Sequence, residues 1–266
     1  ESGSSFYPFT PGWGLSAARM ESGFSDSPDA HFQDIIHSAQ GMCSPRLARV
    51  LSEEAPRRLA ELVELGIRVS RLNESHCFNR HPRSVLAHDM RNIKDVLGNA
   101  VKQRPIDILE NCRVISLAIE NGGCVGAECI KSDSNVRFYI TARATVLATG
   151  GGGGLFKYSL TTHDVTGDGY GLALRAGAWV TNMEFIQIAF GMVAPIWACL
   201  FTEQLFRYEP RLVNSEGKAL TELYFEESEY RDYCRLRMTH APYTSLCPSG
   251  EIDRAVFSEI SAGRGT

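Results

Sequence analysis

The sequence lacks several features that would place a protein in a simple class. Its 27 Lys and Arg are outnumbered by 31 Asp and Glu, and a net charge of −4 gives no basic footprint for nucleic acid. No apolar run approaches the roughly 18 residues that a membrane span requires. The 8 cysteines form no Cys-x-x-Cys pair, which disfavours a zinc site or a disulfide framework and favours free thiols in a reducing, cytoplasmic compartment.

Two further signals are missing. There is no Gly-x-Gly-x-x-Gly fingerprint, the turn that places the pyrophosphate of a dinucleotide at a helix N-terminus. There is also no signal-peptide pattern, although a start at Glu1 rather than Met leaves room for a leader that has been removed. A length of 266 residues with 44% hydrophobic and 22% charged residues is ordinary for one large globular domain or two small ones.

The most distinctive stretch that is present is an apolar run, residues 144–148, that leads into five consecutive glycines at 150–154. Its β-branched and apolar residues predict a buried strand that opens into a loop. Successive bare N–H groups in such a loop suit a phosphate or a polar ring edge, although a tight turn alone would select the same residues.

A second glycine-flanked motif follows. Thr166-Gly-Asp-Gly169 precedes a helical pattern that ends at Gly177. Asp168 thus lies between two glycines at the start of a predicted helix, where its carboxylate is placed for a ribose or a ring nitrogen.

The remaining elements are predicted from capping and periodicity. Ser27 and Ser44, each followed by proline, are expected to start helices, with Pro56 kinking or restarting the second. His31 and His37 share no helical face and are interpreted as surface residues. Three short strands, joined by good turn sequences, predict an antiparallel meander at 114–119, 125–130 and 136–140.

The order of four motifs carries a resemblance to a known family. An Ala-Thr-Gly-Gly strand end at 148–151, then Thr-Gly-Asp-Gly, Arg-Ala-Gly and Asn-x-Glu-Phe-x-Gln follow one another over residues 148–187. This segment resembles the flavoprotein subunits of succinate dehydrogenase and fumarate reductase, and L-aspartate oxidase. The resemblance implies an α/β fold: part of an FAD-binding domain over 1–188, with an inserted antiparallel β-meander at about 108–149, and the start of a capping α+β domain over 189–266.

The resemblance also implies FAD as the cofactor and assigns residues to it. In the family a Ser-Thr-Phe-Tyr run and a glycine pair wrap the flavin, and a backbone amide at the start of the meander meets the adenine. Without the resemblance, the N-terminal run could be an unstructured chain end, and Val114 could be an ordinary valine of the protein core. The cofactor-binding positions implied here are Ser4, Ser5, Gly12, Gly14, Val114, Ala148, Thr149, Gly150, Gly151 and Asp168.

Only some of the family's catalytic residues have a matching residue in this chain. Thr202 and Glu203 match a Thr-Glu motif of the family. Ala189 stands where the family has a histidine that clamps the substrate carboxylate, and Ser249 stands where it has the arginine that donates a proton. The family has a loop with His and Arg at the place of residues 72–91, so Arg83 and His88 are expected to approach the substrate side of the flavin.

The chain is therefore expected to be an interior fragment of an FAD-dependent oxidoreductase with a small-molecule substrate and an unidentified electron-transfer partner. Alone, the fragment should be inactive and bind FAD weakly or not at all. A non-catalytic relative that keeps the scaffold for binding or assembly is one alternative. Another is a ketosteroid-dehydrogenase-like enzyme for an apolar enone, with Phe190, Met192 and Trp197 as pocket walls, although the same residues could simply pack a domain junction.

Overall fold

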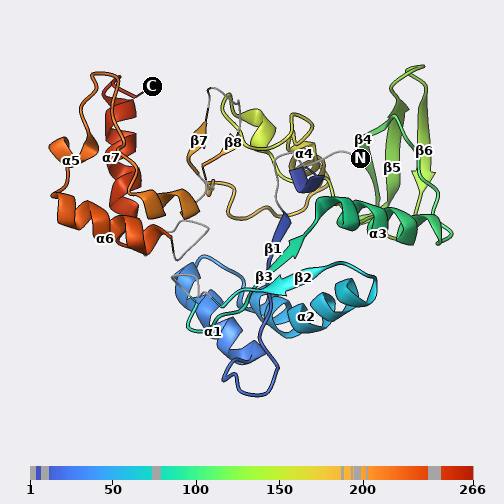
Figure 1. Ribbon diagram of the computed structural model, residues 1–266. Coiled ribbons are helices and arrows are strands. Elements are labelled where there is room, and N and C mark those ends of the chain that lie inside the picture. Colours follow the sequence, from blue (N-terminus) through green and yellow to red (C-terminus); the bar gives the residue numbers. More distant parts are fainter. Residues whose placement is uncertain are drawn as a thin grey trace. The chain divides into compact units, whose positions relative to one another are not determined.

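The computed structural model describes residues 4–6, 12–73, 79–186, 189–192, 194, 199–201, 203–238 and 247–265. It is a mixture of helices and antiparallel sheets that divides into two compact units (Figure 1). The first unit joins residues 1–10 to 94–186, and the second joins 11–93 to 187–266. The domain boundary expected near residue 188 stays a prediction. No described helix is both long and apolar enough to cross a membrane.

The N-terminal part of the second unit is a small sheet with two helices. Strand β1 (Gly12–Ser16) and strand β2 (Val69–Arg71) both pair antiparallel with the central strand β3 (Ser84–His88). Helices α1 (Pro28–Ala39) and α2 (Pro45–Glu64) pack against each other. Ala17, Leu59 and Val85 form the buried apolar cluster of this part.

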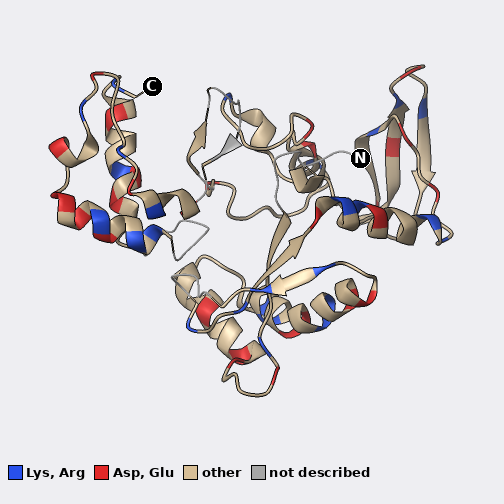
Figure 2. Ribbon diagram, in the orientation of Figure 1, with Lys and Arg blue, Asp and Glu red and all other residues tan. Residues whose placement is uncertain are grey.

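Both predicted helix starts are confirmed. The Ser27 hydroxyl accepts a hydrogen bond from the Ala30 amide at 3.0 Å, and the Ser44 hydroxyl accepts one from the Leu47 amide at 3.4 Å. The expectation of a restart at Pro56 is wrong, because α2 continues through it. Ion pairs one turn apart, visible as alternating charge along α2 in Figure 2, support the helix on both sides of the proline: Arg57 with Glu54, and Arg58 with Glu54 and Glu61.

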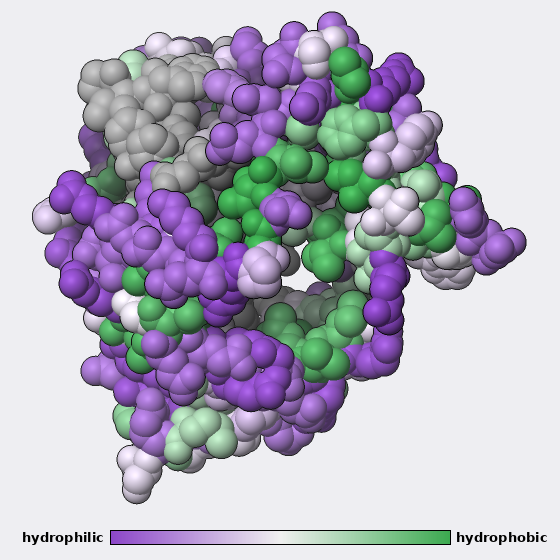
Figure 3. Space-filling view, turned by 90° about the vertical axis from the view of Figure 1, so that its right-hand side faces the viewer, coloured by the Kyte–Doolittle hydropathy of each residue, from purple (hydrophilic) through white to green (hydrophobic). Residues whose placement is uncertain are grey.

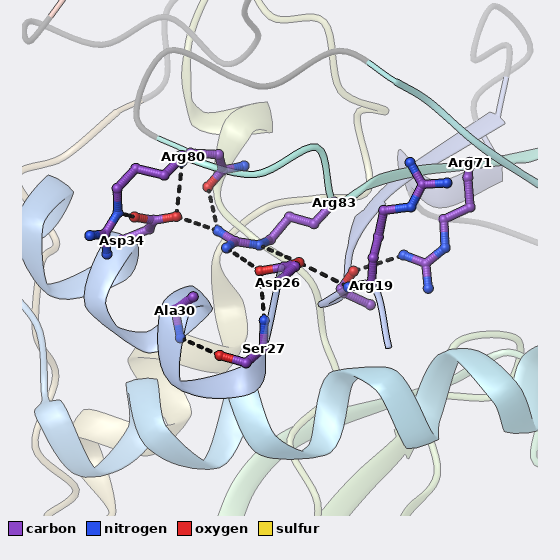
Figure 4. Close-up of polar contacts among 10 residues, drawn as sticks. Arg19, Asp26, Ser27, Ala30, Asp34, Arg71, Arg80 and Arg83 are labelled. Atoms are coloured by element: carbon purple, nitrogen blue, oxygen red, sulfur yellow. Dashed lines mark hydrogen bonds and ion pairs between the residues drawn. The ribbon is translucent and has the colours of Figure 1, made fainter. Parts of the chain in front are cut away.

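A buried arginine joins α1 to the loop before β3 (Figure 4). The Arg83 guanidinium is fully buried and donates to Asp26 at 2.6 Å and to Asp34 at 2.5 Å. Burial is the largest single influence and would raise the pKa of both carboxyl groups. The hydrogen bonds and positive charge of Arg83, together with the other hydrogen bonds that each carboxylate accepts, outweigh it and lower both pKa values. Asp34 also accepts from Arg80, whose side chain is 63% exposed.

The interpretation of His31 as a surface residue is wrong. Its side chain lies on the inner face of α1 and is only 4% exposed. Burial, followed by the positive charge of Arg83, lowers its pKa below the ordinary 6.5, and Asp26 and Asp34 only partly offset this. The error arose because periodicity alone does not show that two buried carboxylates and an arginine stand beside this face. His37, six positions further along the same helix, is exposed as expected.

The other unit contains the predicted meander, and its three strands are confirmed. After helix α3 (Met90–Lys102), strands β4 (Cys112–Glu120), β5 (Gly123–Lys131) and β6 (Arg137–Thr141) form an antiparallel sheet in chain order. Asn121 and Gly122 turn β4 into β5 with positive φ angles of 50° and 77°. These angles suit the twist of a two-residue hairpin turn.

The buried strand predicted at 144–148 is not found. These residues are exposed and form no strand, and the Val146 side chain is 87% exposed. The physical reason is that a buried strand needs a neighbouring strand edge and a covering layer, and among the described residues the meander ends at Thr141 without supplying either. The short 3-10 helices η1 (Ser4–Phe6) and η2 (Gly153–Leu155) and helix α4 (Asp168–Arg175) complete the described elements of this unit.

The C-terminal part of the second unit is mainly helical. The two-residue strands β7 (Gly191–Met192) and β8 (Cys199–Leu200) pair ahead of the 3-10 helix η3 (Glu203–Tyr208). Helices α5 (Leu220–Leu223), α6 (Glu227–Arg237) and α7 (Gly250–Ser261) follow. Phe206, Tyr230, Cys234 and Ile252 form their buried core.

A buried carboxylate holds the end of this helical part together. Glu259 on α7 is 3% exposed and accepts hydrogen bonds from Asn214 at 2.7 Å and from Tyr224 at 2.5 Å. Arg264 donates to both of its oxygens at 2.8 Å. These bonds, led by that of Arg264, lower the pKa of Glu259 to about 2. The carboxylate therefore stays charged and keeps α7 joined to the loop at 214 and to the end of α5.

Replacing Arg83 should destabilise the N-terminal part strongly. Arg83→Met would leave Asp26 and Asp34 buried without their shared cation, and breaking a buried ion pair in this way costs about 3–5 kcal/mol. The matched control is Arg80→Met, which removes an exposed partner of the same Asp34 and should cost less than about 1 kcal/mol. Urea unfolding followed by circular dichroism at pH 7 measures both values. Equal losses of unfolding free energy for the two variants would contradict the assignment of Arg83 as the main partner of the two buried carboxylates.

The buried His31 should make stability depend on pH in a defined window. Because its pKa is lowered in the folded state, the unfolded chain binds a proton first as pH falls below 6.5, and the free energy of unfolding decreases there. The carboxylates Asp26 and Asp34 contribute only at lower pH, through and below their ordinary 3.8. His31→Gln should reduce the loss of unfolding free energy between pH 7 and 5, whereas His37→Gln should leave that loss unchanged. The urea midpoint at each pH is the measurement, and identical slopes for wild type and His31→Gln would exclude the effect.

Candidate functional site

The glycine-rich loop is held against the start of α4 by its backbone. The Gly154 amide donates to the Val165 carbonyl at 2.8 Å, and the Gly167 amide donates to the Gly151 carbonyl at 3.1 Å. Gly167 has a φ of +75° and immediately precedes α4. The loop and the Thr-Gly-Asp-Gly motif, which the sequence treats as two signals, thus form one paired structure that ends at Asp168.

Several of the glycines are required by this contact between chain segments. A Cβ at Gly154 would lie 2.8 Å from the Val165 carbonyl oxygen, one at Gly153 would lie 2.4 Å from the Thr161 hydroxyl, and one at Gly169 would lie 1.9 Å from the Thr149 hydroxyl. At these three positions the missing side chain therefore makes room for another segment of the same chain. Gly150 and Gly151 differ, because a Cβ there would meet only the Val165 side chain, at 3.8 and 3.9 Å.

Two predicted cofactor residues that are distant in the sequence line one pocket. Val114 on β4 and Asp168 at the first turn of α4 both border a cavity of about 280 Å³. Ile115 and Leu172 add apolar walls, and Gly167 contributes backbone. Val114 is 38% exposed, so it is not an ordinary valine of the protein core.

The N-terminal cofactor positions fall into different units. Ser4 and Ser5 lie in η1, whereas Gly12 and Gly14 lie in β1. A Cβ at Gly12 would lie 2.2 Å from the Ala87 carbonyl oxygen, so this glycine is explained by strand pairing with β3. Gly14 has open space around it, and Ala148 and Thr149 are exposed at the entrance of the loop. The assignment of these residues to the flavin stays a prediction.

The positions expected to be catalytic lie in the C-terminal part of the second unit. Glu203 is the first residue of η3, while Thr202 lies outside the described residues, as does Trp197. The Phe190 ring packs 5.9 Å from the ring of Phe206, and the Phe201 amide donates to the Phe190 carbonyl at 2.8 Å. Phe190 therefore packs against the core of this helical part, and its role as a pocket wall or at a domain junction stays a prediction.

A buried arginine stands beside the position where the family's arginine is replaced. Ser249 is fully buried at the start of α7, and its carbonyl accepts a 2.8 Å hydrogen bond from Arg237 on α6. Arg237 is also fully buried and donates to Asp253 at 2.5 Å. No motif in the sequence singles out Arg237, and its contact with Ser249, 12 positions further along the chain, could not be predicted from the sequence. Its guanidinium fixes the start of α7.

The loop residue Arg83, expected near the substrate, is instead enclosed by Asp26 and Asp34. With its side chain fully buried, it has a structural role in the described chain. Among the described residues, no group of three or more His, Cys, Asp or Glu side chains could hold a metal ion.

Apolar side chains are exposed around the loop and the segment after α4. Figure 3 shows hydrophobic residues at the surface of the face that it views, among hydrophilic ones. In the unit that holds the loop, Val146, Leu155 and Trp179 are 87%, 71% and 99% exposed.

Comparison with known proteins gives the site its context. The model of the family described as FAD binding domain matches residues 11–264. One of the subunits of the fumarate reductase (CoM/CoB) from Methanothermobacter marburgensis is 31% identical over 253 residues, which is 91% of this chain and 43% of that protein. L-aspartate oxidase from Mesorhizobium japonicum is 33% identical over 264 residues, 95% of this chain and 47% of that protein.

Solved structures agree with these relatives. Mycobacterium smegmatis Sdh1, solved in complex with UQ1, has a TM-score of 0.71 at 30% identity over 97% of this chain and 44% of its own. The FrdA protein of E. coli quinol fumarate reductase has a TM-score of 0.70 at 22% identity, a likeness of fold alone. The chain spans less than half the length of each of these proteins. It belongs to the FAD binding domain family, among relatives that are fumarate reductase and succinate dehydrogenase flavoproteins and L-aspartate oxidases.

Proposed function

We propose that this chain is part of an FAD-dependent oxidoreductase that transfers a hydride between the flavin and a small-molecule substrate, with an electron-transfer partner still to be identified. The observation that carries the proposal is the shared pocket of Val114 and Asp168, two positions that the resemblance assigns to the cofactor from distant parts of the sequence. The family match and the exposed apolar surface beside the loop support a larger protein around these residues.

The residues assigned to the cofactor fit it chemically. Asp168 lines the pocket and would accept hydrogen bonds from hydroxyl groups of the ligand. Gly150 and Gly151 would offer bare backbone N–H groups to it. The Ser4 hydroxyl oxygen is buried and has no hydrogen-bond partner among the described residues, as expected for a group that a ligand satisfies. When bound, FAD supplies the ring system that accepts or gives up the hydride.

The substrate should differ from the small dicarboxylates, such as fumarate and succinate, that the family resemblance implies. Ala189 cannot bind a carboxylate, and the serine at 249 is buried with its carbonyl bonded to Arg237. Because Arg237 is itself buried against Asp253, it already serves to hold α7. A non-catalytic relative stays the alternative, and the presence of flavin absorbance in the intact protein separates the two.

FAD should bind this 266-residue chain only weakly. The pyrophosphate-binding turn normally supplies much of the charge-assisted hydrogen bonding to a dinucleotide, and the sequence contains no such fingerprint. Titration followed by flavin fluorescence should give a dissociation constant above the micromolar level, and Asp168→Ala should weaken binding further. A sub-micromolar dissociation constant for FAD with the wild-type chain would contradict this prediction.

The intact flavoprotein should not turn over fumarate, succinate or L-aspartate at ordinary enzyme rates. Loss of a positioned general acid costs about 10²–10⁴-fold, and the carboxylate-binding side chain at 189 is missing as well. Turnover is measured with a redox dye on protein whose flavin content has been established by absorbance, so that an empty protein is not mistaken for an inactive one. Rapid turnover of any of the three compounds would show that other residues perform these roles.

A further inference from the structure

Helix α2 has an exposed row of residues in addition to its buried side. The buried side consists of Ala48, Ser52 and Leu59, and it packs toward α1 and the small sheet. The exposed row repeats at alternating intervals of four and three positions, which is the spacing of a coiled-coil seam. We call this row the α2 seam; it comprises Leu47, Leu51, Glu54, Arg58, Glu61 and Leu65, the residue that ends the helix.

The α2 seam is apolar at its ends and charged in its middle. Leu47, Leu51 and Leu65 are 60%, 54% and 42% exposed. Between them lie Glu54, Arg58 and Glu61, whose charges Figure 2 shows along α2. Covering the leucines would remove apolar surface from water. The central charges restrict the partner to one that presents opposite charges there and apolar groups at both ends.

The α2 seam matches itself when it is read in the opposite direction. Leu47 and Leu65 both lie nine positions from Pro56, and Glu54 and Arg58 both lie two positions from it. About a two-fold axis at Pro56, Leu47 therefore stands opposite Leu65 of a second copy, and Glu54 stands opposite Arg58. Each of these contacts occurs twice, as a symmetric interface requires.

The charges also select the direction of the second helix. A parallel pair would set Glu54 against Glu54 and Arg58 against Arg58, and such contacts between like charges are unfavourable. In the antiparallel pair each Arg58 meets a carboxylate. Arg58 already binds Glu54 and Glu61 of its own helix at 2.9 and 2.8 Å, and its five N–H donors permit a further carboxylate.

We propose that α2 is a homodimerisation surface, on which a second copy of this chain packs its own α2 antiparallel about an axis at Pro56. The inference does not rest on the proposed function, because none of the six seam residues lines the β4–α4 pocket. A helix of 20 residues is only about 30 Å long. One such helix pair buries less than the roughly 1,200 Å² of a standard interface, so the dimer is weak.

The test follows the dimer by sedimentation velocity of the 266-residue chain. Between about 10 µM and 1 mM, the range expected for a small interface, the wild type should pass from monomer to dimer. Arg58→Glu sets two carboxylates against each other at both central contacts and should weaken dimerisation about tenfold at low salt. Arg57→Glu is the matched control, because it makes the same change of charge at an exposed neighbour outside the seam.

A mixture of two variants tests the antiparallel pairing itself. Glu54→Arg should also weaken dimerisation, because it sets an arginine against Arg58 of the second copy. In an equimolar mixture of Glu54→Arg and Arg58→Glu, the two introduced side chains face each other and the native Arg58 faces the native Glu54, so the dimer should return. Variants that were merely less stable would not regain association on mixing, and circular dichroism establishes that each is folded.

Three results would overturn the inference. The first is a wild-type chain that stays monomeric over the whole concentration range. The second is association that Arg58→Glu leaves unchanged, since the contact then involves another surface, such as the exposed apolar residues of the other unit. The third is a mixture that associates no better than its components. In each case the proposed flavin chemistry is unaffected, because it is tested by FAD binding.

Discussion

The candidate site depends on a direct contact between two backbone segments. The glycine-rich loop at 150–154 and the segment at 165–167 hydrogen-bond to each other through main-chain groups, and Asp168 begins α4 at the end of this pairing. A side chain at Gly154 or Gly169 would collide with the partner segment. The glycines of the loop therefore differ in role, since some permit the chain to pack on itself, whereas Gly150 and Gly151 have no such close neighbour.

The two buried arginines show how a charge that the sequence associates with chemistry can be used for structure. Arg83 is enclosed by Asp26 and Asp34, and Arg237 is held by Asp253 and the Ser249 carbonyl. A guanidinium removed from water must be paired, and once paired it fixes the elements that supply its partners. The arginines that line the β4–α4 pocket, Arg113 and Arg175, are different because they are exposed.

Much of the local structure follows from the sequence. Ser27 and Ser44 capped the helices that they were expected to start, and the turn residues at 121–122 produced the meander in its predicted order. These features depend on neighbouring residues only, since a cap, a turn and a strand period are satisfied within a few positions of the chain. The order of the four motifs over residues 148–187 was likewise sufficient to identify the family.

Only the tertiary structure decided which groups far apart in the chain are buried and which of them pair. The apolar run at 144–148 has the composition of a buried strand and yet is exposed, because burial is a property of the neighbours that cover a segment. His31 was expected at the surface and is buried, close enough to Arg83, Asp26 and Asp34 for their charges to influence its pKa. From the sequence alone, Val114 and Asp168 could only be proposed as cofactor residues. That they line one pocket was decided by the packing of α4 against β4, two elements that are distant in the chain.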